Sequence, residues 1–63
     1  MTEGSWRIVA VNDDGFRDLQ ICRSLSHAGD RLPMWRDQLA TGKLKDEDGR
    51  YYRHLEIVYC PYL

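Results

Sequence analysis

Apolar and polar residues alternate in two stretches near the N-terminus, Trp6–Val11 and Phe16–Arg23. A period of two residues is typical of a β-strand. The residues between them, Asn12-Asp13-Asp14-Gly15, have the composition of a type I turn that ends in a left-handed glycine. The pattern therefore predicts a hairpin over residues 6–23, with residues 1–5 as a frayed lead-in.

The same turn chemistry recurs at Asp46-Glu47-Asp48-Gly49. Lys43-Leu44-Lys45, before this turn, is short and charged, as edge strands often are. The stretch after it, Arg50 to Tyr59, is longer and ends before Pro61, which cannot donate to a strand ladder. We predict a second hairpin over residues 43–60.

The alternation also assigns the strand faces. Leu19 and Ile21 share one face of their strand with Arg17 and Arg23, whose long side chains can reach water at its ends. In the last strand Leu55, Ile57 and Tyr59 form one face, while the opposite face holds Tyr52, His54, Glu56 and Val58.

One helix is predicted between the hairpins, over residues 30–42. Asp30 is a suitable N-cap, Pro33 is tolerated in a first turn, and Gly42 fits a left-handed C-terminal position. The apolar residues Leu32, Trp35 and Leu39 share one helical face. We therefore predict an α+β fold of order ββαββ, with one helix packed on one face of a four-stranded antiparallel sheet.

The chain has 63 residues with a net charge of −1, and 43% of them are hydrophobic. A single domain this small buries only about 60% of the surface of its unfolded chain. Nearly all large apolar side chains are then needed for the core, so we expect no enzyme and no cofactor. The apolar runs Ile8–Val11 and Ile57–Cys60 are too short for a membrane helix or a signal peptide, so we expect a cytoplasmic protein.

Four residues have the identity of zinc ligands, namely Cys22, His27, His54 and Cys60. Their spacings are loose, and His54 lies about 20 Å from Cys60 along an extended strand. Zinc is therefore only a weak alternative. A disulfide between the two cysteines requires neighbouring strands, and the expected compartment disfavours it.

Two further sites are excluded by their pattern. Ser26 and His27 have the residue types of a catalytic nucleophile and base, but they fall in a predicted loop without a nucleophile elbow. The acidic turns lack the alternate ligand positions of a calcium loop, since Leu44 stands where the first carboxylate belongs.

The preferred hypothesis is a non-enzymatic protein-binding module that occupies its partner's surface. If the hairpins lie side by side, both acidic turns fall at one end of the sheet, where they resemble the charge of a nucleic acid. By analogy with small phage-encoded inhibitors, this suggests regulation of a larger nucleic-acid-handling complex. The expected contact residues are Asp13, Asp14, Asp46, Glu47 and Asp48.

Direct single-strand nucleic-acid binding is the alternative, because arginines lie beside aromatic residues at several places. Its candidates are Arg36, Arg50, Tyr52 and Arg53, with Tyr52 exposed on the last strand. A winged DNA reader ranks third, since no second helix precedes Trp35. The chain is expected to be a monomer or a homodimer, because a short edge strand can pair with its twin.

Overall fold

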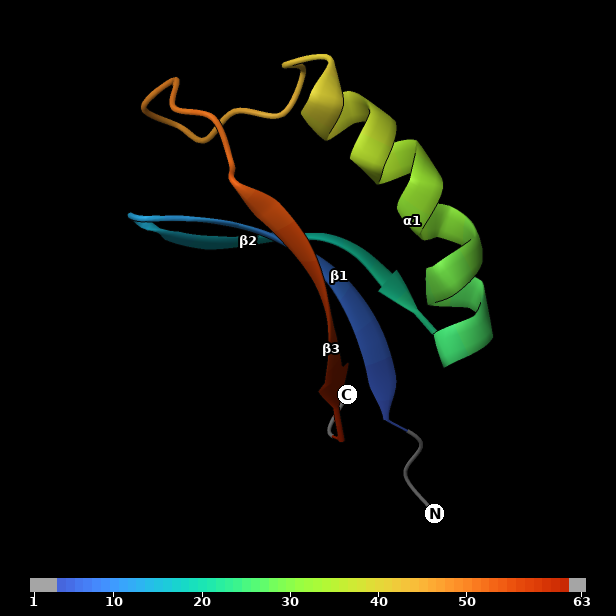
Figure 1. The fold of residues 1–63 in the computed structure, drawn as a ribbon. Coiled ribbons are helices and arrows are strands. Elements are labelled where there is room, and N and C mark those ends of the chain that lie inside the picture. The colour runs from blue at the N-terminus through green and yellow to red at the C-terminus, as the bar shows by residue number, and fades with distance from the viewer. Residues whose placement is uncertain (1–3, 62–63) are drawn as a thin grey trace.

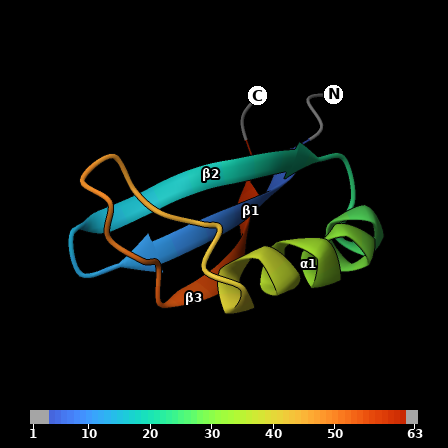
Figure 2. The same cartoon turned by 90° about the horizontal axis from the view of Figure 1, so that it is seen from above.

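The computed structural model describes residues 4–61 of the chain, so the predicted lead-in at residues 1–5 lies mostly outside the described residues. Strand β1 spans Ser5–Asn12, β2 spans Gly15–Cys22, helix α1 spans Leu25–Ala40 and β3 spans His54–Cys60. The strands form one antiparallel sheet of order β2-β1-β3. The α+β class with one helix on an antiparallel sheet is confirmed, and the helix covers a single face (Figures 1 and 2).

The first hairpin forms as predicted. The backbone N–H of Asp14 donates to Asn12 Oδ1 at 3.0 Å, and Gly15 has a positive φ of 144°. The second turn closes in the same way, since Asp48 N donates to Asp46 Oδ1 at 2.9 Å and Gly49 has a φ of 79°. The Asn12 and Asp46 side chains thus accept hydrogen bonds from backbone N–H groups within the turns, which have no partner in the strand ladder.

Strand β2 departs from the predicted alternation. Gln20 lies opposite Ile8 while Asp18 lies opposite Val9, so Leu19 is the extra residue of a β-bulge. The extra residue reverses the alternation beyond it. Cys22 therefore faces the helix and is fully buried, whereas Ile21, predicted on the same face as Leu19, is 60% exposed on the opposite face.

The helix begins five residues earlier than predicted. Ser24, rather than Asp30, is the N-cap, and its hydroxyl accepts from His27 N at 3.1 Å. The early start brings Ala28 against the sheet, where it is fully buried beside Ile8 and Cys22. Pro33 consequently lies inside the helix instead of in its first turn.

The core lies between α1 and one face of the sheet. The predicted apolar stripe of Leu32, Trp35 and Leu39 packs on it, as do Leu55 and Ile57 from β3. Buried Ile8 and Ala10 of the central strand lie beneath this stripe. Trp35 Nε1 also donates to Gln20 Oε1 at 3.0 Å, so the N–H group of the partly buried indole is hydrogen-bonded.

The predicted fourth strand and the ββαββ order are not confirmed. Only an isolated bridge joins Lys45 to Tyr51 across the second turn. Leu44 and Tyr52 instead turn into the core against Ala10, where they are 7% and 8% exposed. Arg53 N then donates to the carbonyl of Val11 at 2.7 Å, which leads β3 onto the free edge of β1.

The two helix starts are distinguished by substitution. We expect Ser24→Ala to lower the free energy of unfolding by about 1 kcal/mol, because the N-cap acceptor is lost. Asp30→Ala, within the helix, should change it by less than about 0.5 kcal/mol. Urea unfolding followed by circular dichroism measures both values, and a larger loss in Asp30→Ala would contradict the observed helix start.

Candidate functional site

The two acidic turns lie at one end of the sheet, as predicted (Figure 1). Asn12 Nδ2 of the first turn donates to Asp46 Oδ2 of the second at 2.8 Å. This contact spans 34 residues of sequence and holds the turns together. The five predicted acidic contact residues therefore belong to one region of the surface, which also contains the arginines of the alternative hypothesis.

Two of the five acids form ion pairs within the chain. Arg50 pairs with Asp14 at 2.6 Å and Arg53 pairs with Asp13 at 3.0 Å. Arg50 and Arg53, predicted to bind nucleic acid, thus neutralise Asp14 and Asp13, predicted to bind a partner protein. Among the five acids, only the side chains of Glu47 and Asp48 have no hydrogen bond or ion pair within residues 4–61.

The aromatic member of the alternative site is not where the sequence placed it. Tyr52 was expected beside His54 on an exposed strand face, but it precedes β3 and is buried against Ala10 and Leu44. Arg36 lies on α1 and is exposed. The exposed Arg–Tyr platform predicted for nucleic-acid bases is therefore not formed by these residues.

Asp46 acts as a brace inside the second turn. Its carboxylate accepts from the backbone N–H groups of Arg50 and Asp48, both at 2.9 Å, and from the Asn12 amide. The backbone hydrogen bond from Arg50 is the largest of the effects that lower the pKa of Asp46 below its ordinary value. This acid is engaged in holding the loop.

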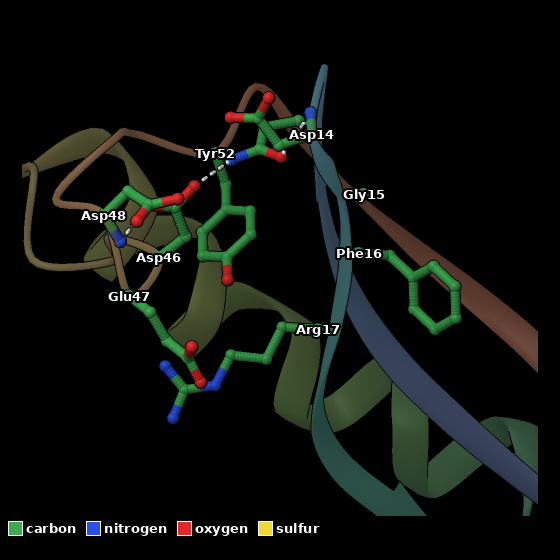
Figure 3. Close-up of a pocket in the computed structure, with 9 residues that line it drawn as sticks. Asp14, Gly15, Phe16, Arg17, Asp46, Glu47, Asp48 and Tyr52 are labelled. Carbon is green, nitrogen blue, oxygen red and sulfur yellow. Dashed lines mark hydrogen bonds between the residues drawn. The ribbon is translucent and has the colours of Figure 1, made fainter.

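A pocket of about 410 Å³ opens between the two turns (Figure 3). Its walls carry Arg17 from β2 and Glu47 and Asp48 from the second turn. The Tyr52 ring stands between the walls with its hydroxyl directed toward Glu47 and Arg17, and these two side chains point toward one another. Phe16 borders the pocket, but its ring points to the opposite side of β2 from the Arg17 side chain, since successive residues of a strand alternate in direction.

The weak zinc set is dispersed. Cys22 faces the helix from β2, while Cys60 ends β3 on the far side of β1, so the two are roughly 10 Å apart, too far for a disulfide. His54 lies at the opposite end of β3, near Glu56 at 3.1 Å. His27 and Ser26, predicted in a loop, lie in the first turn of α1. In the described part of the chain no three metal-binding side chains converge.

The sheet face opposite the helix is a second candidate surface, which sequence reasoning missed. Within residues 4–61 no element packs on it (Figure 2). It is a shallow depression of about 680 Å³. We call it the open face and define it by the residues that the strand register places there, namely Ser5, Arg7, Val9, Val11, Phe16, Asp18, Ile21, His54, Glu56, Val58 and Cys60.

The open face exposes several large apolar side chains, with charged residues between them. Phe16 is 73% exposed, Ile21 60% and Val58 43%, while Val9 at the centre is shielded by its neighbours. Its arginine is matched, because Arg7 pairs with Asp18 at 2.9 Å. Part of this face was visible in the sequence, since Val9, Val11 and Val58 alternate with core residues; the bulge that adds Ile21 was not.

Comparison with protein families, with curated proteins and with solved structures gives no match. In the described part of the chain, no helix is both long and apolar enough to span a membrane.

Acidification tests the brace at Asp46. Because the pKa of Asp46 is lower in the folded chain than in the unfolded one, its contribution to stability is complete at neutral pH. It is lost as the pH falls below about 4 and through the folded pKa. We expect Asp46→Ala to have a lower urea midpoint than the native chain at pH 7, with a gap that narrows below pH 4. A difference in urea midpoint that stays constant with pH would contradict a stabilising role for the ionised Asp46 carboxylate.

Proposed function

We propose that this chain is a non-enzymatic protein-binding module that contacts its partner through the open face of the sheet. The observation that supports the proposal is the exposure of Phe16, Ile21 and Val58 together on a face that α1 leaves uncovered. Large exposed apolar patches on small domains are typical of protein–protein contact sites. Burying such side chains against a partner is favourable by about 25 cal/mol per Å² of apolar area.

Charge favours a protein over a nucleic acid as the occupant. The open face carries Asp18 and Glu56 against one guanidinium, that of Arg7, which pairs with Asp18, while Glu56 lies 3.1 Å from the His54 ring. Phosphates would meet an excess of carboxylates there. A partner protein with an apolar patch and a basic rim complements both the apolar residues and the acidic excess.

The acidic turns contribute less to this contact than their sequence suggests. Asp13, Asp14 and Asp46 already have partners within the chain. A partner would have to separate these groups before using their charge. Inhibition of a nucleic-acid-handling complex through these turns remains a prediction from the sequence.

Site-specific photo-crosslinking tests the proposal. A benzoylphenylalanine at position 16 should crosslink to one stoichiometric protein in the source cells, whereas the same group at Leu25, 51% exposed on the helix, should not. Val58→Lys should weaken binding of that protein about ten-fold or more, because a charge is buried in the contact. Met34→Lys, a matched change at a helix residue that is 40% exposed, should leave the affinity unchanged.

Two results would overturn the proposal. The first is equal crosslinking from positions 16 and 25, or equal weakening by Val58→Lys and Met34→Lys. The second is a crosslink at position 16 to another copy of this chain, accompanied by a dimeric mass in light scattering. The face would then be a homodimer contact rather than a partner site.

A further inference from the structure

We infer that the pocket between the two turns is a binding site for a guanidinium group, the chemistry of an arginine side chain. The site is distinct from the open face, because Tyr52, Glu47 and Asp48 line this pocket and not the depression on that face, although Phe16 borders both (Figure 3). Its volume of about 410 Å³ is ample for one such group.

The buried tyrosine is the first argument. Tyr52 is only 8% exposed, and its hydroxyl is directed into the pocket. Within residues 4–61 this hydroxyl has no hydrogen-bond partner, and it is open to the pocket rather than enclosed by the protein. It is therefore available to accept a hydrogen bond from a ligand in the pocket.

The charge of the walls is the second argument. Glu47 and Asp48 line the pocket without an ion pair in the described chain, whereas Asp14 and Asp46 are already engaged. The charge left unengaged is therefore that of two carboxylates against one guanidinium, that of Arg17, and this net negative charge favours a cation. A planar guanidinium has five N–H donors and can reach a carboxylate and the Tyr52 hydroxyl at once, while an ammonium is a compact point charge.

Arg17 already places one guanidinium group at the wall of the pocket. Its guanidinium points toward Glu47 from the opposite wall, yet the two form no ion pair. A free guanidinium entering the pocket would take up the position between them. The positive charge of Arg17 repels a second cation, so its removal should strengthen binding.

Titration followed by ¹⁵N–¹H NMR tests the site, with N-acetyl-arginine amide as the probe and matched salt. We expect saturable shifts confined to the two turns and Tyr52, and binding of N-acetyl-lysine amide at least about five-fold weaker. Tyr52→Phe should weaken binding about three- to ten-fold, because one hydrogen bond is lost. Its urea midpoint should match that of the native chain, since the hydroxyl has no partner in the fold.

Charge variants complete the test. The double variant Glu47→Gln, Asp48→Asn should lose binding, and Arg17→Ala should strengthen it about two- to three-fold. Asp37→Asn, an exposed acid on α1, is the matched control and should change nothing. A blocked Gly-Arg-Gly peptide that binds more tightly than agmatine indicates a partner protein's arginine as the source, and the reverse order indicates a free small guanidinium compound.

The inference is overturned by the absence of saturable shifts, by equal affinity for the arginine and lysine probes, or by tighter binding of acetate than of either. Binding that survives in Tyr52→Phe unchanged would also contradict it. None of these outcomes depends on the open face, so the site and the proposed function fail separately.

Discussion

The structure depends on one apolar contact, the stripe of α1 that covers the buried residues of β1. Leu32, Trp35 and Leu39 pack over Ile8 and Ala10, and within residues 4–61 this is where the buried apolar side chains concentrate. A chain of 63 residues has enough apolar area for one such layer. The opposite face of the sheet is consequently left without a cover.

The one-sided core also determines which surfaces of the molecule are left for binding. Leu44 and Tyr52 are drawn toward the helix side, which replaces a regular second hairpin by a loop pinned at Asn12 and Asp46. That loop brings acids and arginines together, where Arg50 and Arg53 pair with Asp14 and Asp13, while Glu47 and Asp48 have no ion pair within residues 4–61. The surfaces left for binding are the open face and the small pocket at whose centre the Tyr52 hydroxyl lies.

Local chemistry made part of this fold predictable. The Asn12–Gly15 and Asp46–Gly49 turns follow from side-chain acceptors and positive-φ glycines, and Trp35 and Leu39 follow from helical spacing. The bulge at Leu19 and the burial of Tyr52 were not predictable, because both arise from packing between distant segments. The acidic cluster was located correctly, but its pairing with Arg50 and Arg53 depends on the same long-range packing.

Nuclear Overhauser contacts between side chains test the one-sided core most directly. The account predicts contacts from the Trp35 ring and the Leu32 methyl groups to Ile8 and Ile57, and none from α1 to Val58 or Ile21. Contacts between the helix and Ile21 or Val58 would show that the bulge does not reverse the alternation, or that both faces are covered. Either result would contradict the account.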